Sequence, residues 1–180
     1  MKYLNLFSTK VILSIFVLFV GLSGHGSVNS LSTLPEHLKN HVVSKFADAK
    51  QIACMANNIF YEANGENTKG QIAVARVVMN RIQHGFGANP CKVINQVTKV
   101  DNKKVCQFSW VCENKPTPNK NDPRYVKAMD IAYQVLALDM HKDIIPKSVL
   151  FFHNTTVQPN WPHRKVMTIG NHVFYSKVYK

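Results

Sequence analysis

Residues 48–81 read DAKQIACMANNIFYEANGENTKGQIAVARVVMNR. Asp48 lies three residues before Gln51, which is the spacing of a capping box, so we predict a helix that begins at Ala49. The apolar residues of this helix recur at helical spacing and form one stripe: Ile52, Met55, Ala56, Ile59 and Ala63. The stretch therefore opens with an amphipathic helix.

A second helix follows after a sharp turn at Glu62-Ala63-Asn64-Gly65-Glu66. Asn64-Gly65 favours the left-handed backbone that ends helices, and Thr68-Lys69-Gly70-Gln71 is a second capping box. The next apolar stripe is Ile72, Ala75, Val78, Met79 and Ile82. On a wheel turning about 100° per residue, Glu62 lies beside Met55 at the edge of the first stripe. We predict that Glu62 faces a cleft, although a solvated carboxylate at a helix end is the simpler interpretation of this residue alone.

The later chain predicts fewer and shorter elements. Residues 99–104 read as a polar loop, and the alternation in Cys106–Cys112 predicts a strand or extended ledge. A third helix is predicted to begin at Pro123, behind Asn121-Asp122. Val149–Phe152 and His172–Tyr175 read as short strands. The predicted fold class is α+β, mainly helical with a few short strands.

The N-terminus has the order of a secretory signal peptide. Lys2 and Lys10 precede an apolar run of 12 residues, Val11–Leu22, and Gly24 and Gly26 follow it. The run is short for a membrane span, which needs roughly 20 residues, but an uncleaved anchor is the alternative. We predict a signal peptide at 1–26, a linker at 27–47 and a domain at 48–180. The domain is thus expected to be exported to the periplasm, the cell wall or the medium.

The charge of the exported part indicates an anionic partner. The 180 residues hold 22 Lys and Arg against 10 Asp and Glu, and removal of Lys2 and Lys10 leaves 20 − 10 = +10. A basic surface is typical of nucleic-acid binding, but the leader argues against that class. For an exported protein the bacterial wall is the better target. We expect membrane contact only through an uncleaved N-terminal segment.

The four cysteines, Cys54, Cys91, Cys106 and Cys112, are an even number in an oxidising compartment, which predicts two disulfides. Three pairings are open. A zinc site is the competing interpretation, but no Cys-x-x-Cys or His-Glu-x-x-His spacing supports it. We expect neither a metal nor a cofactor.

Several blocks of the chain resemble the SleB-type, spore-cortex-lytic cell wall hydrolases. Ile59–Glu66, Gly70–Ala75 and Val78–Arg81 resemble that family's E-A-R-G-E, G-Q-x-A-V-A and V-x-N-R-V motifs, with Asn64 in place of the usual Arg. The later blocks, in the same order, are Pro90–Gln96, Gln107–Trp110, Phe152–Asn154, Pro159–Trp161 and Ile169–Tyr175.

This resemblance implies a lysozyme-like fold related to the lytic transglycosylases, and cleavage of peptidoglycan between N-acetylmuramic acid and N-acetylglucosamine. It also implies that Glu62 serves first as acid and then as base, while the muramic 6-hydroxyl of the substrate attacks. A muramidase that uses water and a second carboxylate is the nearest rival. A non-catalytic wall-binding protein is the rival from another class.

A glycan cleft needs aromatic platforms and polar partners for sugar hydroxyl and acetamido groups. The candidate substrate-binding residues are Gln107, Ser109, Trp110, His153, Asn154 and Trp161. For the aromatic residues and the histidine, a structural role is the alternative. For Phe108 and Trp110, burial in a core strand is an equally good interpretation. For His153 the alternative is a purely structural role, and for Trp161 it is to hold its loop in place.

Overall fold

The computed structural model describes residues 35–178. The chain divides into two units, Met1–His41 and Val42–Lys180, and the disulfides and the candidate site lie in the second. The predicted signal peptide, 1–26, lies outside the described residues. Within residues 35–178, no helix combines the length and the apolar character needed to cross a bilayer.

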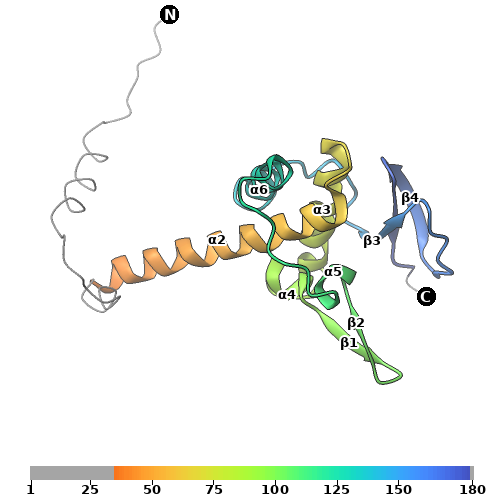
Figure 1. Ribbon diagram of the computed structural model, residues 1–180, viewed down its shortest axis with the longest axis horizontal. Coiled ribbons are helices and arrows are strands. Elements are labelled where there is room, and N and C mark those ends of the chain that lie inside the picture. Colours follow the sequence, from red (N-terminus) through yellow and green to blue (C-terminus); the bar gives the residue numbers. More distant parts are fainter. Residues whose placement is uncertain (1–34, 179–180) are drawn as a thin grey trace, which may run out of the picture. The chain divides into compact units, whose positions relative to one another are not determined.

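The described part contains both helices and strands, as predicted (Figure 1). The helices are α2 (Glu36–Ala63), α3 (Thr68–Gln83), α4 (Pro90–Ile94), α5 (Ser109–Cys112) and α6 (Pro123–Leu136). The strands are β1 (Val97–Val100), β2 (Lys103–Cys106), β3 (Val149–Asn154), β4 (Arg164–Ile169) and β5 (His172–Ser176).

The two-helix prediction is confirmed, but its boundaries were wrong. Helix α2 begins at Glu36, so Asp48 lies inside the helix and caps nothing, and the helix runs into the predicted linker. Helix α3 is capped one residue earlier than predicted, because the side chain of Asn67 accepts a hydrogen bond from the Gly70 amide at 2.9 Å. The predicted left-handed turn at Asn64-Gly65 is also wrong, since the positive φ angles of the described residues lie elsewhere.

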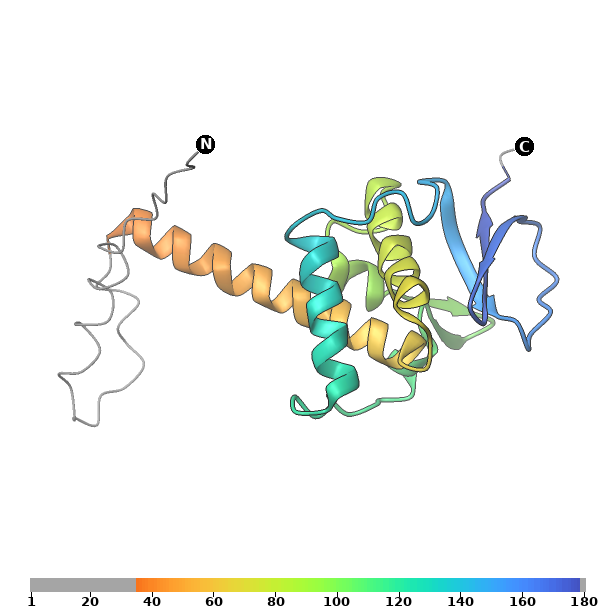
Figure 2. The ribbon, with the colours of Figure 1, turned by 90° about the horizontal axis from the view of Figure 1, so that it is seen from above.

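Helix α3 forms the centre of the unit. One side packs with α2, α4 and α6 around a core that includes Met55, Ile59 and Val78, and the other side packs with the C-terminal strands around Ala73, Val77 and Phe174. In Figure 2, α6 lies beside α3 on the side away from those strands. Because both sides are covered, α3 is buried over most of its surface rather than along a single stripe.

The third helix begins as predicted. Asp122 caps α6 by accepting a hydrogen bond from the Arg124 amide at 2.9 Å, and Pro123 occupies the first turn. Pro is suited to this position because the first amides of a helix have no partner within it.

The predicted loop at 99–104 is instead a hairpin. Strands β1 and β2 pair antiparallel through a two-residue turn, Asp101-Asn102, whose φ angles are 49° and 61°. Two successive positive φ angles are the requirement of the tight hairpin turn that matches strand twist, and Asp and Asn tolerate them.

The C-terminal sheet has the strand order β3-β5-β4, with both pairs antiparallel. Strands β3 and β5 were predicted, but β4 was not. Strand β4 exposes much of its length, whereas β3 and β5 each contain consecutive buried residues, so β4 lacks the apolar signal of the other two.

Two disulfides form, which confirms the cysteine prediction. Cys54 pairs with Cys91 and joins α2 to α4, while Cys106 pairs with Cys112 and joins the end of β2 to α5. All four cysteines are used, so none is free to bind zinc. The second bridge lies where a strand was predicted over Cys106–Cys112. That prediction is wrong, because Ser109–Cys112 is one turn of helix.

Candidate active site

Glu62 lies in the last turn of α2, one residue before the helix ends. Met55 and Ile59 lie on the same side of the helix and are 0% exposed, whereas Glu62 itself is partly buried. The predicted place of Glu62 at the edge of a buried stripe is therefore confirmed.

Two hollows meet at Glu62. The larger has a volume of about 430 Å³ and the smaller about 290 Å³. The larger is lined by Tyr61, Glu62, Ser109, Trp110, Glu113, Lys115, Phe152, His153, Asn154 and His172. The smaller is lined by Glu62, Arg81, Gln107, Phe108, Ser109, Phe151, Phe152, His153 and Trp161. All seven residues predicted as catalytic or substrate-binding thus line one hollow or both.

Burial raises the pKa of Glu62 from 4.5 to about 7. The positive charge of Arg81 opposes this shift, and the negative charge of Glu113 adds to it. Burial has this effect because the ionised carboxylate loses hydration while the neutral acid loses little. Near pH 7 Glu62 is divided between its two protonation states, so it can both give and take a proton.

Arg81, on α3, was not predicted as a site residue. It is 3% exposed, its Nε donates to the carbonyl of Leu150 at 2.7 Å, and its guanidinium lies 5.2 Å from the ring centre of Phe108. Burial lowers the pKa of Arg81 to about 10, with the charge of Glu62 acting against that shift. Arg81 therefore stays charged at neutral pH. In the sequence, Arg81 was visible only as a basic residue two positions after the apolar run Val77-Val78-Met79.

Gln107 contacts this guanidinium directly. When its amide is oriented to satisfy both groups, the Gln107 oxygen accepts hydrogen bonds from the two terminal nitrogens of Arg81 at 3.0 and 3.1 Å. The backbone amide of Gln107 donates to Gln96 at 2.9 Å, which ties it to the chain just before β1. Gln107 thus orients Arg81 in addition to lining the smaller hollow.

The two aromatic residues of the Gln107–Trp110 segment have different roles. Phe108 is 3% exposed and belongs to the core, whereas Trp110 is partly buried and lines the larger hollow. The Trp110 indole donates to Oδ1 of Asn58 at 3.1 Å, and its ring stacks on Tyr61 with the centroids 4.9 Å apart. Tyr61, which was not predicted, therefore joins Trp110 in one aromatic wall.

His153 and Asn154, at the end of β3, and Trp161, in the loop before β4, line the hollows that Glu62 also lines. Nδ1 of His153 donates to the carbonyl of Asn154 at 2.8 Å, so Nε2 is left to accept from the Tyr175 hydroxyl at 2.9 Å. Trp161 packs edge-on against His153 at 5.5 Å and is 39% exposed. His153 is thus both a lining residue and a satisfied structural histidine.

Glu66 is not part of either hollow. Its Oε2 accepts a hydrogen bond from the backbone amide of Asn171 at 3.0 Å. A Cβ atom on Gly170 would lie 1.9 Å from that oxygen, and the φ of Gly170 is +56°. Glu66 therefore holds the β4–β5 turn against the α2–α3 turn.

His172, the residue after Asn171, was also missed. It is 4% exposed, lines the larger hollow, and its Nδ1 has no partner among the described residues. Burial lowers the pKa of His172, with Glu66 acting against this shift and His153 adding to it. His172 is therefore neutral at neutral pH and presents a polar ring to the hollow.

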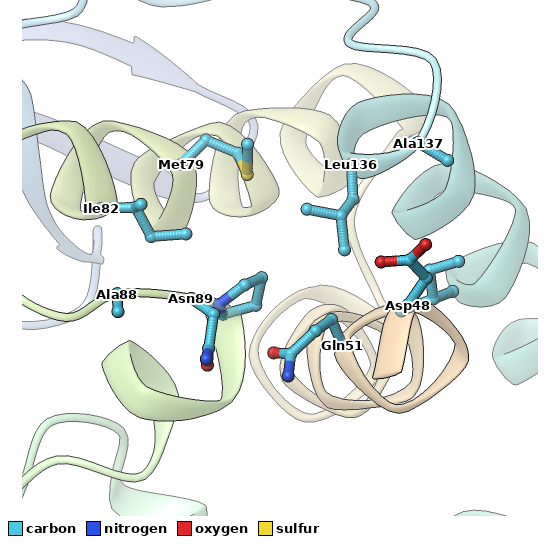
Figure 3. A pocket seen from close by; sticks show the side chains of 10 residues that line it. Asp48, Gln51, Met79, Ile82, Ala88, Asn89, Leu136 and Ala137 are labelled. Atoms are coloured by element: carbon cyan, nitrogen blue, oxygen red, sulfur yellow. The ribbon is translucent and has the colours of Figure 1, made fainter. Parts of the chain in front are cut away.

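A separate hollow of about 450 Å³ lies between α2, α3 and α6 (Figure 3). Met79, Ile82 and Leu136 line it, and Asp48 is its one acidic residue. Gln51 there already accepts a hydrogen bond from the Cys91 amide at 3.1 Å. This hollow lacks the converging polar groups found around Glu62.

The family comparison agrees with the resemblance seen in the motifs. A family profile described as Cell Wall Hydrolase matches residues 65–175. The match includes Arg81, Gln107 and the C-terminal sheet, and it begins three residues after Glu62. Neither a curated protein nor a solved structure matches the chain significantly. Because the profile covers more than half of the 180 residues, the chain belongs to the cell wall hydrolase family.

Proposed function

We propose that the protein is an exported lytic transglycosylase with a lysozyme-like catalytic domain. It cleaves peptidoglycan between N-acetylmuramic acid and N-acetylglucosamine, with Glu62 as its single acid and base. Membership of the cell wall hydrolase family supports a peptidoglycan-acting hydrolase. The observation that carries the finer proposal is a carboxyl group with a pKa of about 7 between two hollows.

In the first step, Glu62 donates its proton to the oxygen that links the two sugars. The bond from the muramic C1 to this oxygen breaks, and the glucosamine leaves with a hydroxyl group. Positive charge develops on the muramic ring while Glu62 becomes a carboxylate. The buried charge of Arg81 lowers the pKa of Glu62 and so stabilises this carboxylate.

In the second step, the Glu62 carboxylate takes the proton from the muramic 6-hydroxyl. That oxygen forms a bond to C1, which gives a 1,6-anhydro sugar and returns Glu62 to its protonated form. No water is consumed. Both steps need a group that changes protonation state near the working pH, and Glu62 meets that requirement.

The remaining lining residues would hold the sugars. Ser109, Asn154 and His172 offer a hydroxyl, an amide and an imidazole to the larger hollow, and Trp110 offers a ring face. Trp161 offers a second aromatic surface to the smaller hollow. Sugar rings present apolar faces and polar edges, so this mixture fits them.

A muramidase that uses water is the second candidate. The observation in its favour is a second carboxylate, Glu113, in the same hollow as Glu62. Glu113 lines the larger hollow, and its charge raises the pKa of Glu62. However, its side chain is 50% exposed and pairs with Lys115 at 3.2 Å. Glu66 is a poor second carboxylate because it is engaged by Asn171.

The products from purified sacculi test the proposed reaction. We expect mass spectrometry to find 1,6-anhydromuramic ends, which are one water lighter than reducing muramic ends. Reducing muramic ends as the main product would instead support the muramidase. Intact sacculi after long incubation would favour the non-catalytic wall-binding protein.

A further inference from the structure

A third hollow continues the cleft beyond the aromatic wall of Tyr61 and Trp110. It has a volume of about 200 Å³, against about 430 Å³ for the larger hollow at Glu62. The two share Tyr61, Trp110 and Lys115. The third hollow is lined by Cys54, Asn57, Tyr61, Ile94, Asn95, Trp110, Lys115, Pro116 and Thr117. The smaller hollow, the larger hollow and the third hollow are therefore neighbours in that order.

The third hollow offers polar groups that are free to meet a ligand. Asn95 donates through Nδ2 to the Cys91 carbonyl at 2.9 Å, and its Oδ1 has no partner among the described residues. Asn57 accepts from the Tyr125 hydroxyl at 2.9 Å through Oδ1, which leaves its Nδ2 available. The exposed hydroxyl of Thr117 is likewise without a partner in residues 35–178. Amide oxygen, amide nitrogen and hydroxyl are the partners that sugar hydroxyl and acetamido groups need.

The walls of the third hollow are held in place before any ligand binds. The Cys54–Cys91 disulfide joins α2 to α4, which carry lining residues on two sides. The Cys106–Cys112 disulfide closes the segment that presents Trp110. The Tyr61 hydroxyl donates to the carbonyl of Pro116 and ties the third side, the loop at 113–121, to α2. A preorganised wall lowers the conformational entropy that binding costs.

We propose that the third hollow is a distal subsite for one further N-acetylated sugar of the glycan strand. This inference rests on the proposed function, because it extends the same cleft. A strand that occupies all three hollows would cross the face of the Tyr61–Trp110 pair, where an apolar sugar face can stack. The enzyme would then prefer long strands over short fragments.

Glycan affinity as a function of strand length tests the subsite. We expect the full chain with Glu62→Gln to bind glycan while cleaving it very slowly, so its dissociation constant can be measured by calorimetry with a peptide-free tetrasaccharide and octasaccharide from the wall. We expect the octasaccharide to bind more tightly. Adding Asn95→Leu and Thr117→Ile should lower the affinity for the octasaccharide about tenfold more than the affinity for the tetrasaccharide. A change of this size corresponds to the loss of one or two hydrogen bonds.

Thr168→Ile is the matched control, because Thr168 is exposed on β4 and lines none of the three hollows. It should leave both affinities unchanged. Equal affinity for the two lengths, or an equal effect of Asn95→Leu/Thr117→Ile on both, would overturn the subsite and leave the proposed function standing. Failure to bind either oligosaccharide would overturn the proposed function, and the subsite with it.

Discussion

Glu62 owes its pKa to three contributions of different sign. Burial is the largest and raises the pKa, Arg81 lowers it, and Glu113 raises it further. The net value of about 7 is well above the usual carboxyl range. A residue that must deliver a proton to a leaving oxygen benefits from this arrangement, because it holds that proton at neutral pH.

The pH dependence of the reaction follows from this shift. The acid form of Glu62 is needed for the first step, and it is depleted as the pH rises through about 7. We expect kcat/KM on soluble glycan strands to fall about tenfold per pH unit well above that value. A profile that stays level up to pH 9 would contradict the role of Glu62 as acid. The thermal unfolding midpoint is recorded at each pH. It shows whether activity is lost because Glu62 loses its proton or because the protein unfolds.

The site residues differ in how far the sequence could reveal them. Gln107, Ser109 and Trp110 were recognisable from the sequence. An amide, a hydroxyl and an aromatic ring, which are three kinds of group that bind sugars, occur together in that one short segment. Arg81 and His172 stand in blocks that carry the family resemblance, but they were not predicted as site residues, because their roles depend on groups brought from distant parts of the chain. Arg81 meets the Leu150 carbonyl and Gln107, while His172 packs against Phe152 and shares the larger hollow with residues from α2 and α5.

At the scale of elements, Glu66 ties the turn between α2 and α3 to the turn between β4 and β5 of the C-terminal sheet. The carboxylate accepts from Asn171 at 3.0 Å and touches the turn at Gly170, directly before His172 of the larger hollow. Glu66 is therefore a positioning residue for the sheet side of the cleft.

Changes at this contact should destabilise the protein. Gly170→Ala introduces an atom 1.9 Å from Glu66 Oε2 at a φ of +56°, and Glu66→Ala leaves the Asn171 amide without its acceptor. We expect each to lower the free energy of unfolding by about 1 to 3 kcal/mol. Gly65→Ala is the control, since nothing lies within 4 Å of the added atom and the φ of Gly65 is not positive. Urea unfolding measures the three changes, and equal stability of all three variants would refute the anchoring role.

The elements that sequence reasoning missed share a physical cause. The β1–β2 hairpin carries no glycine at its turn, and all four residues of β1 are exposed, so neither turn composition nor apolar alternation marked it. Strand β4 is recognisable only through its pairing with β5. By contrast, α6 was predicted with its correct start because Asp122-Pro123 is a local signal that needs no distant partner.

At the scale of the whole molecule, the formal net charge of +12 suits an anionic polymer. Family membership and the two disulfides agree with a role at the cell wall or outside the cell, where oxidising conditions preserve such bridges.

Binding to the wall should therefore depend on salt. The Glu62→Gln protein is used because it is expected to digest sacculi very slowly. We expect it to be retained less on insoluble sacculi as sodium chloride rises above about 0.1 M, where exposed charges are screened beyond about 10 Å. Sedimentation of the sacculi gives the bound fraction. Retention that does not change with salt would show that the charge is incidental and that the cleft alone holds the glycan.

The central claim is that Glu62 alone carries the acid and base chemistry, and paired glutamine variants test it most directly. Glu62→Gln keeps the shape and the hydrogen-bonding capacity of the side chain but cannot release a proton on demand, and Glu113→Gln removes the second carboxylate of the same hollow. The rate of release of soluble fragments from purified sacculi should fall by about 10² to 10⁴ in Glu62→Gln, and far less in Glu113→Gln. Circular dichroism confirms that both variants are folded. A folded Glu62→Gln protein that digests sacculi at the parent rate would contradict the claim, and loss of activity in both variants would show that two carboxylates are required.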